Sequence, residues 1–272
     1  MTAAAQQIAS WPVDHAAAAA VRPDGQMVFS AGDLSRPFRL ASVTKLLTAY
    51  ATLMAVEEGA LTLDDAAGPE GSTVRHLLAH TSGLAFDDHT ALAAPGTRRL
   101  YSNAGFEQLA DAVAKHAGMP FADYVIEGLL TPLGMTSTDY SGSPASGASS
   151  TGADLARFAA ELLSPTLLHT STLDDAVTVA FPGLNGVLPG YGHQKPNDWG
   201  LGFEIRDGKT PHWTGSTNSP RTFGHFGQAG TFLWVDRDLG AACVALADRD
   251  FGPWAVEAWP PFNDAVVAEL RE

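Results

Sequence analysis

The chain has 272 residues, of which 45% are hydrophobic and 17% charged, so it can bury a substantial core and is neither disordered nor collagen-like. Thirty acidic residues against sixteen scattered basic ones give a net charge of −14, which argues against nucleic acid as a partner. No apolar run approaches the roughly 18 residues of a membrane-spanning helix, and the N-terminus lacks the pattern of a secretory signal. We therefore expect a cytoplasmic protein with no membrane partner.

The first elements expected along the chain are two strands, over residues 16–21 and 26–30, joined by a hairpin turn at residues 22–25. Apolar residues at helical spacing then predict a long helix over residues 42–58, which Gly59 ends. The middle of the chain continues with helical patterns, and the last of them begins with a sequence that resembles a capping box. These further helices are predicted over residues 73–80, 103–117, 121–130 and 151–163.

After Pro189 the apolar residues follow a period of two, which is typical of strands. The sequence predicts strands over residues 199–205, 231–236 and 241–247, a final helix over residues 262–270, and a serine-rich surface loop over residues 141–150.

Strands at both ends of the chain must share one sheet, so the helical middle is expected to form an inserted lobe. The predicted fold class is α+β with α/β/α layers, a mainly antiparallel sheet flanked by helices. We predict a single domain over residues 1–272, in which residues 1–58 and 190–272 form a sheet-containing lobe and residues 59–189 a helical lobe. A crevice between such lobes is a favoured place for a ligand.

Several familiar motifs are absent. Neither Gly-x-Ser-x-Gly nor Gly-x-Gly-x-x-Gly occurs, and the GKT of residues 208–210 cannot end a P-loop because Phe203 stands where its first glycine belongs. His76 and His80 have the spacing of a zinc-binding helix but lack the glutamate between them, so we predict no metal and no cofactor. The single cysteine, Cys243, is expected to be buried and inert.

Ser42 and Lys45 form a Ser-x-x-Lys motif at the start of the first long helix. Their spacing places the hydroxyl and the amine on one helical face, and the free N–H groups of a helix start favour an oxyanion. The neighbouring Leu46 and Leu47 could desolvate the amine enough for it to accept a proton near neutral pH. The pair is a candidate nucleophile with its base. The alternative is a helix-capping serine and an exposed lysine.

Tyr101 and Asn103 form a Tyr-x-Asn motif just before the next long helix. The phenol could share a proton with Lys45, whose positive charge would lower the pKa of Tyr101. The amide of Asn103 could orient the lysine or bind a substrate carbonyl. The alternative is a half-buried tyrosine followed by a helix-capping asparagine.

His225 and Gly227 form a His-x-Gly motif ahead of the predicted strand 231–236. A strand edge beside the nucleophile can offer backbone N–H groups to an oxyanion, and a glycine there lets a substrate approach closely. A rival candidate is the WTGS of residues 213–216, which runs into a loop and lacks the strand that this role requires. We therefore prefer His225.

The three motifs, in this order, resemble the penicillin-recognising serine hydrolases, above all the branch of class C β-lactamases, related DD-peptidases and β-lactamase-like esterases. The resemblance covers about residues 16–250 and implies a β-lactamase/transpeptidase-like fold. Beyond the motifs it rests on the sequences VRHLLAHTSGL (74–84), PGTRRLYSNAGFEQLA (95–110), LLTPLGMTST (129–138), STGADLARF (150–158) and FGHFGQAGTFLWVD (223–236).

The resemblance implies a role for each motif residue. Ser42 would be the acylated nucleophile, Lys45 its proton partner and Tyr101 the general acid and base. On the substrate side, Asn103 would bind the acyl part, and His225 would stand where many members carry the lysine of Lys-Thr-Gly. The backbone N–H groups of Ser42 and Gln228 would form the oxyanion hole.

Two departures from the family pattern affect the expected substrate. The chain is short for this branch between Gly83 and Pro95 and between Thr138 and Ser150, so the site is expected to be open. His225 is mostly neutral at pH 7, whereas a lysine would suit a substrate carboxylate; we expect His225 to imitate the lysine only when it is protonated toward pH 6. A histidine at this position is typical of the esterase-like members.

The leading hypothesis is a serine hydrolase that forms an acyl-enzyme on Ser42 from esters or small amides. The alternative within the family is a β-lactamase or a D-amino-acid (DD-) peptidase. A catalytically inactive binding protein is a lesser alternative, since such a protein would be expected to lose Ser42, Lys45 or Tyr101. The expected partner is a small-molecule ester, amide or lactam, and the sequence does not predict the oligomeric state.

Overall fold

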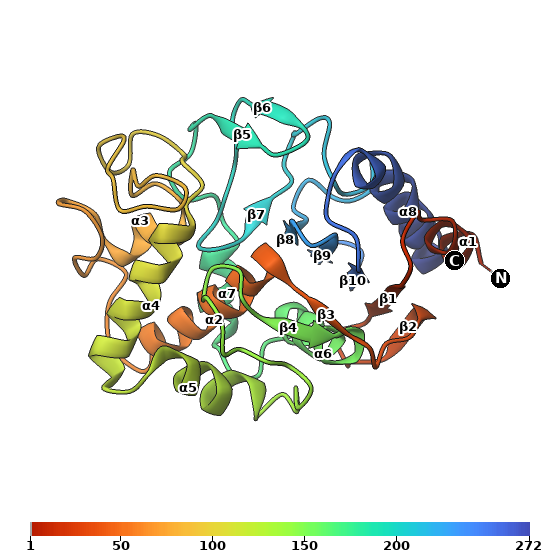
Figure 1. Cartoon of the computed structure of the whole chain (residues 1–272), viewed down its shortest axis with the longest axis horizontal. Helices are drawn as coiled ribbons and strands as arrows, with labels where there is room; N and C mark the ends of the chain where they lie inside the picture. Colours follow the sequence, from red (N-terminus) through yellow and green to blue (C-terminus); the bar gives the residue numbers. More distant parts are fainter. Residues whose placement is uncertain (1) are drawn as a thin grey trace.

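A six-stranded antiparallel sheet runs through the computed structural model, which describes residues 2–272 (Figure 1). Its strand order is β2-β1-β10-β9-β8-β7, so the first hairpin of the chain pairs with the last strand. The strands are β1 (Ala16–Val21), β2 (Met27–Gly32), β7 (Glu204–Ile205), β8 (Phe223–Gly227), β9 (Thr231–Asp236) and β10 (Ala241–Ala247). Two small sheets pair β3 (Pro37–Arg39) with β4 (Ser149–Thr151) and β5 (Gly186–Leu188) with β6 (Gly192–Gln194).

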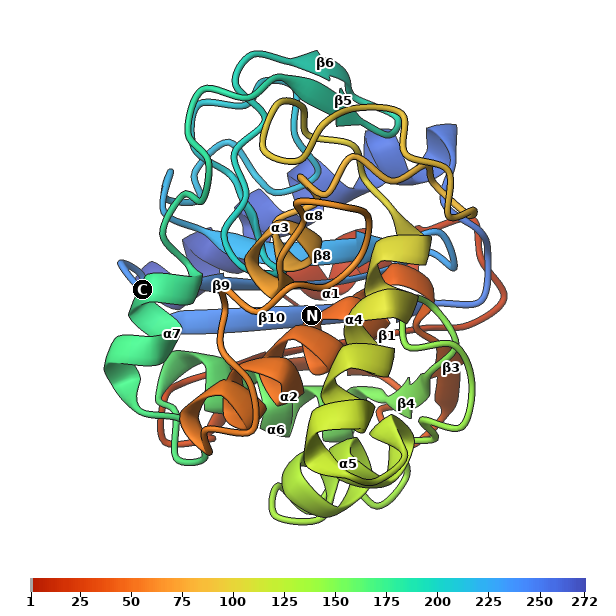
Figure 2. The ribbon, with the colours of Figure 1, turned by 90° about the vertical axis from the view of Figure 1, so that its left-hand side faces the viewer.

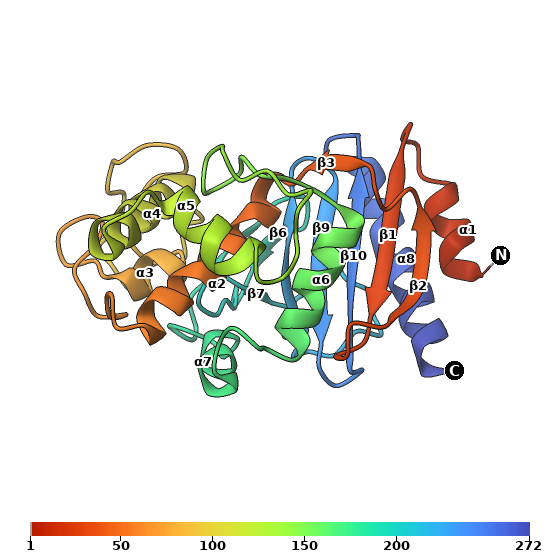
Figure 3. The same ribbon diagram turned by 90° about the horizontal axis from the view of Figure 1, so that it is seen from below.

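The helices lie on both faces of the sheet and at one end of the molecule (Figures 2 and 3). They are α1 (Ala3–Ala9), α2 (Thr44–Glu57), α3 (Val74–Leu78), α4 (Asn103–Ala117), α5 (Phe121–Val125), α6 (Gly152–Leu163), α7 (Thr170–Ala176) and α8 (Pro253–Arg271). A 3₁₀ turn, η1 (Ala41–Val43), precedes α2, and a π-helical turn, η2 (Ile126–Leu130), extends α5.

Strand β10 shows why the sheet is covered on both faces. Its side chains alternate between two cores: Ala242, Val244 and Leu246 pack on the side of α2 and α6. Cys243, Ala245 and Ala247 pack on the side of α8. All seven residues of β10 are buried, and the small side chains of β1 and β10 let the helices approach closely. The predicted α+β sandwich is confirmed, and Cys243 is buried and free, as expected.

Most predicted elements are confirmed with small shifts of their ends. The structure has β9, β10 and α4 with the predicted bounds. The capping interaction at the start of α6 is also present, since the Thr151 hydroxyl accepts a hydrogen bond from the Asp154 N–H. Helix α6 belongs to the predicted helical lobe, residues 59–189, yet packs against β1 and β10. This packing joins the two predicted lobes closely, and their division at residues 59 and 189 stays a prediction.

The last helix is longer than predicted. It begins at Pro253 instead of residue 262 and contains Pro260 and Pro261 in its interior. A proline ordinarily ends a helix, because it lacks an N–H group and clashes with the preceding turn. Here the added turns bury Trp259, whose ring lies 5.1 Å from that of Phe232 on the sheet, so tertiary packing holds the helix through the prolines.

Other differences concern short segments and helix ends. Helix α1, helix α7 and the small strands are not predicted by the sequence patterns. Within the predicted strand 199–205 only β7 is extended and paired as a strand, and the predicted loop 141–150 contributes its last residues to β4. His80 lies beyond the end of α3 with a φ of 55°, so His76 and His80 do not share a helical face as a zinc-binding pair would.

Within residues 2–272, no helix is long and apolar enough to cross a membrane. In the same residues, no group of three or more histidine, cysteine or acidic side chains is arranged to hold a metal ion.

Candidate active site

Ser42 lies in the 3₁₀ turn η1, directly ahead of α2. Ala41 before it has a φ of 45°, a left-handed conformation that costs a residue with a Cβ about 1–3 kcal/mol and is concentrated at functional sites. The N-cap position of α2 is occupied by Val43, so the interpretation of Ser42 as a helix-capping serine is wrong. Ser42 is half-buried, and its hydroxyl faces Lys45 and a cavity.

Lys45 is fully buried, so the alternative of an exposed lysine is also wrong. Its Nζ donates to Asn103 Oδ1 at 2.6 Å and to the Ala145 carbonyl at 2.8 Å, and it lies 3.4 Å from Ser42 Oγ. A neutral amine has two N–H bonds and one lone pair. Two acceptors satisfy both N–H bonds and leave the lone pair for the Ser42 proton.

Burial also sets the charge of this amine. It lowers the pKa of Lys45 to about 7, against the opposing negative charges of Asp87 and Glu107. The nearest wall is aromatic, with the rings of Tyr101 and Phe106 centred 4.7 and 5.5 Å from Nζ. A large fraction of Lys45 is therefore unprotonated at neutral pH, as a general base requires.

Tyr101 keeps its proton. Burial raises the pKa of Tyr101 above its ordinary value, a hydrogen bond with Ser42 opposes the rise, and the charge of Glu204 adds to it. The expected lowering of this pKa is wrong, because burial disfavours the phenolate and is the largest influence on the pKa of Tyr101. Tyr101 is therefore a neutral phenol, able to donate a proton.

His225 is neutral for a related reason. Its Nδ1 lies 2.6 Å from the Phe226 carbonyl, which can only accept, so Nδ1 carries the hydrogen. Its Nε2 lies 3.1 Å from Tyr101 Oη and accepts the phenol hydrogen. Burial and the charge of Lys45 lower the pKa of His225 to about 3, although Glu204 and the Phe226 carbonyl oppose this. The expectation that His225 gains a proton near pH 6 is wrong.

Asn103 is the first residue of α4, and the capping residue is Ser102, whose hydroxyl accepts from the Gly105 N–H at 2.9 Å. The capping alternative for Asn103 is therefore wrong. Its Oδ1 accepts from Lys45, and its Nδ2 donates to Asp87 Oδ1 at 2.8 Å. Both ends of the amide are engaged, so the geometry favours an orienting role toward Lys45 over the binding of a substrate carbonyl.

Strand β8 passes directly beside Ser42 and contains His225, which the sequence patterns place ahead of a strand and not within one. A Cβ on Gly227 would lie 2.3 Å from the Leu40 carbonyl oxygen and 3.2 Å from the Ser42 nitrogen. Only a glycine fits this approach. The next residue, Gln228, lines the same cavity as Ser42.

A cavity of about 270 Å³ brings the predicted residues Ser42, Tyr101, His225 and Gln228 together. The rival segment 213–216 does not line this cavity. The Trp213 side chain is buried and donates to Glu204, and the Ser216 hydroxyl bonds Asp264 on α8 instead.

Among the lining residues that the sequence patterns did not single out are His80, Trp199 and Glu204. The His80 ring packs on those of Tyr101 and Trp199, with centroids 4.3 and 4.8 Å away, and so fixes the wall beside the phenol. The pKa of His80 is lowered well below its ordinary value, and burial is the largest cause. The signal that could have found it is the polar sequence HTSG, which directly follows an apolar helix.

Glu204 is the buried carboxylate of β7. Its Oε1 accepts from Lys209 Nζ at 3.0 Å and His212 Nε2 at 3.1 Å, and its Oε2 accepts from Trp213 Nε1 at 2.6 Å. Burial alone would raise the pKa of Glu204, but these partners hold it well below the usual range. The wall of the cavity therefore contains an ionised carboxylate that is held by three hydrogen bonds and whose charge is compensated by the buried Lys209 ammonium.

Comparisons with known proteins agree with this fold. The family described as Beta-lactamase matches residues 13–268. A crystal structure described as a beta-lactamase from Mycobacterium bovis is 56% identical, covers 98% of this chain and 99% of that one, and superposes with a TM-score of 0.96. EstCE1, described as a hydrolase with promiscuous acyltransferase activity, shares only the fold: it is 17% identical, with 97% and 96% coverage and a TM-score of 0.78.

A curated relative matches only part of the chain. The D-alanyl-D-alanine-carboxypeptidase/endopeptidase AmpH of Escherichia coli is 30% identical over 143 residues. The match covers 39% of this chain and 37% of the relative, so the chain is aligned to well under half of that protein. Because the family match spans nearly all of the sequence, the chain belongs to the Beta-lactamase family, a family of serine hydrolases.

Proposed function

We propose that the protein hydrolyses esters or small amides through an acyl-enzyme on Ser42. The observation that carries this proposal is the buried amine of Lys45, which has acceptors for two N–H bonds and faces Ser42 Oγ with its remaining position. A lysine with a pKa of about 7 can take the serine proton at neutral pH.

In the acylation step, Ser42 Oγ attacks the substrate carbonyl carbon while its proton passes to Lys45 Nζ. The negative charge that develops on the carbonyl oxygen is met by the N–H groups of Ser42 and Gln228. The carbon–oxygen bond to the leaving group then breaks, and Tyr101 supplies its proton to the departing alkoxide. The Lys45 ammonium returns a proton to the Tyr101 phenolate, so the acyl-enzyme is left with both groups in their starting states.

Deacylation repeats these transfers with water as the nucleophile. Water loses a proton to Lys45 as its oxygen bonds to the acyl carbon, and the bond to Ser42 Oγ breaks. The serine oxygen regains a proton from Lys45, either directly or through Tyr101. The carboxylic acid product leaves, and atoms and charges balance over the cycle.

The neutral imidazole of His225 favours esters over substrates with a carboxylate beside the reacting carbonyl. A lysine at this position would supply a permanent positive charge for that carboxylate. His225 has a pKa of about 3 and supplies none.

The second candidate function is that of a β-lactamase or DD-peptidase. It is favoured by the 56% identity to the Mycobacterium bovis protein that is described as a beta-lactamase, and by the partial match to AmpH. Parallel assays with a neutral nitrophenyl ester and a chromogenic cephalosporin distinguish the two candidates. The proposal requires a higher kcat/KM for the ester.

The acyl-enzyme itself is tested by labelling with a fluorophosphonate probe. We expect one covalent adduct on Ser42, none on Ser42→Ala, and loss of ester turnover in that variant to a residue of at most about 10³-fold over water. Because the Ser42 side chain caps no helix, Ser42→Ala should retain the fold, which circular dichroism checks. An adduct that persists in Ser42→Ala would show that another residue is the nucleophile. No adduct on the folded wild-type protein would favour a binding protein.

A further inference from the structure

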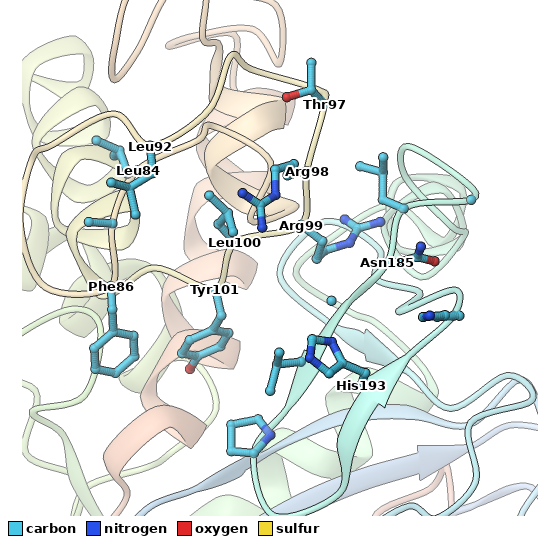
Figure 4. A pocket seen from close by; sticks show the side chains of 17 residues that line it. Leu84, Phe86, Leu92, Thr97, Arg98, Arg99, Leu100, Tyr101, Asn185 and His193 are labelled. Carbon is cyan, nitrogen blue, oxygen red and sulfur yellow. The ribbon is translucent and has the colours of Figure 1, made fainter.

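A second and larger hollow, about 820 Å³, adjoins the cavity at Ser42 (Figure 4). It lies between the segment 84–101, which leads into α4, and the segment 183–195, which contains β5 and β6. The two spaces share several lining residues, so a molecule bound at Ser42 can extend from one into the other. The shared residues are Phe86, Arg99, Tyr101, Val187 and Pro189. We call this space the outer hollow.

The outer hollow gathers positive charge in a strongly acidic protein. Within residues 2–272, which contain all sixteen lysines and arginines, only Arg98, Lys115 and Lys195 make no hydrogen bond, ion pair or aromatic contact. Two of these three, Arg98 and Lys195, line the outer hollow, together with His193. None of its seventeen lining residues is acidic, although the chain has 30 aspartates and glutamates.

The neighbouring arginine does not share this role. Arg99 is buried, and its guanidinium donates hydrogen bonds to backbone carbonyl oxygens. Donor–acceptor distances are 2.6 Å to Ala79, 2.8 Å to Ala180 and 3.0 Å to Asn197. Arg99 therefore holds the wall together, whereas Arg98 is exposed and has its donors available. Figure 4 shows Arg98 above the aromatic rings of Phe86 and Tyr101, with His193 on the opposite wall.

The same hollow also exposes apolar side chains. Phe86, Leu92 and Val187 are 54%, 59% and 53% exposed, and they are half of the six large hydrophobic residues exposed in the described chain. Exposed apolar side chains grouped around one hollow mark a binding surface. Next to unpaired cations, they fit a ligand with an apolar body and an anionic end.

We propose that the outer hollow binds the distal part of the substrate, and that this part is an apolar segment ending in a carboxylate. The inference rests on the proposed function, since it assigns the far end of an ester or amide whose carbonyl lies at Ser42. Arg98 and Lys195 meet the carboxylate, and Phe86, Leu92 and Val187 contact the segment that leads to it. The preferred substrate thus carries its charge away from the reacting carbonyl and not beside it, where His225 is neutral.

The test compares ester pairs that differ only in the distal charge. On the acyl side, the nitrophenyl monoester of adipic acid is compared with nitrophenyl hexanoate. On the alcohol side, the acetate ester of 3-(4-hydroxyphenyl)propionate is compared with that of the corresponding amide. The pair with the larger ratio of kcat/KM for its charged member over its neutral member shows which end of the substrate occupies the outer hollow. The variants are Arg98→Gln, Lys195→Gln and the double variant, with Lys115→Gln as a matched control for loss of a surface charge elsewhere.

We expect wild-type kcat/KM to favour the charged member of one pair by about five- to thirtyfold at low salt, as for a few exposed charge-assisted contacts. Each single variant should lower this preference about three- to tenfold, and the double variant should abolish it, while Lys115→Gln keeps it. The kcat/KM of the neutral member should stay within about twofold in every variant, and added salt should weaken the wild-type preference. A preference that the double variant retains, or that Lys115→Gln loses equally, would overturn the proposal.

The failure of this proposal can be distinguished from failure of the proposed function. If Ser42 is labelled and the neutral esters are hydrolysed, but neither pair shows a charge preference, the outer hollow has another use and the hydrolase remains. If no ester is hydrolysed, calorimetric binding of adipate monoamide and of hexanamide to the wild type and the double variant tests the hollow alone. The proposal is supported if the wild type binds adipate monoamide more tightly than hexanamide and the double variant loses this difference. It is rejected if the wild type binds the two amides equally or binds neither.

Discussion

The phenol oxygen of Tyr101 lies 3.1 Å from Nε2 of His225, and the phenol is the donor in this hydrogen bond. The direction follows from the other ring nitrogen, which must donate to the Phe226 carbonyl. With His225 and Tyr101 both buried and neutral, Lys45 is the one of these three groups whose pKa lies near 7. The pH dependence of the reaction should therefore report on the lysine.

The first prediction concerns that pH dependence. Protonated Lys45 has no lone pair for the Ser42 proton, so kcat/KM for a neutral ester should fall about tenfold per pH unit below the pKa of about 7 and be flat above it. Glu107 raises the pKa of Lys45, so Glu107→Gln should move this acid limb to lower pH. Rate profiles between pH 5 and 9 would check both, and an acid limb that His225→Gln removes would assign the titration to His225 instead.

The second prediction concerns the sharing of one proton by Lys45 and Tyr101. Lys45→Ala and Tyr101→Phe should each lower the rate by about 10²–10⁴, the usual contribution of general acid–base catalysis. Because both groups handle the same proton, the double variant should be little worse than the poorer single variant. Single-turnover rates for the three variants test this. A loss equal to the product of the two single losses would mean that the residues act independently.

The third prediction concerns the charge at position 225. A lysine there adds a permanent charge that can form a charge-assisted hydrogen bond of about 1.5–3 kcal/mol with a carboxylate beside the reacting carbonyl. His225→Lys should raise kcat/KM for a chromogenic cephalosporin by roughly 10- to 150-fold relative to that for a neutral nitrophenyl ester. Since His225 has a pKa of about 3, the same ratio in the wild type should not change between pH 6 and 8. A ratio that His225→Lys leaves unchanged would remove residue 225 from the substrate site.

The fourth prediction concerns stability and Glu204. Glu204→Gln would leave the fully buried Lys209 ammonium without its counter-charge, which should cost about 3–5 kcal/mol of the free energy of unfolding. Adding Lys209→Met should recover part of the loss by removing the unpaired charge. Glu70→Gln, on the surface, is the matched control and should stay within about 0.5 kcal/mol. Urea denaturation measures all four proteins, and a Glu204→Gln variant as stable as the control would show that the ion pair contributes nothing.

The pH dependence of stability follows from the same carboxylate. The folded-state pKa of Glu204 is held below the usual carboxyl range, so the stability that it contributes is present above that range and declines as the pH falls through it. The wild type should therefore lose more stability between pH 7 and pH 4 than the double variant Glu204→Gln/Lys209→Met. Denaturation curves at the two pH values give this comparison.

Local patterns in the sequence were enough to predict most strands of the sheet, though not β8, together with several helices and the candidate residues. Strand β9 and helix α4 have the predicted bounds, because alternation and helical spacing are properties of consecutive residues. Ser42 and Lys45 face each other for the same reason, since they are three positions apart on helical backbone. The final helix was predicted too short, because its prolines are tolerated only through contacts of Trp259 with a strand.

The protonation states, in contrast, were decided by the tertiary structure. Neither the pKa of Lys45 nor that of His225 follows from its neighbours in sequence. Both side chains are buried by segments that are distant in the chain, and this burial removes the water that would stabilise their charges. The sequence itself determined which groups meet at Ser42, through the spacing of short motifs. Only the fold decided that the pKa of Lys45 falls to about 7, that His225 and Tyr101 are neutral there, and that Arg98 and Lys195 stand unpaired in one hollow. Desolvation and pairing depend on residues far apart in the chain.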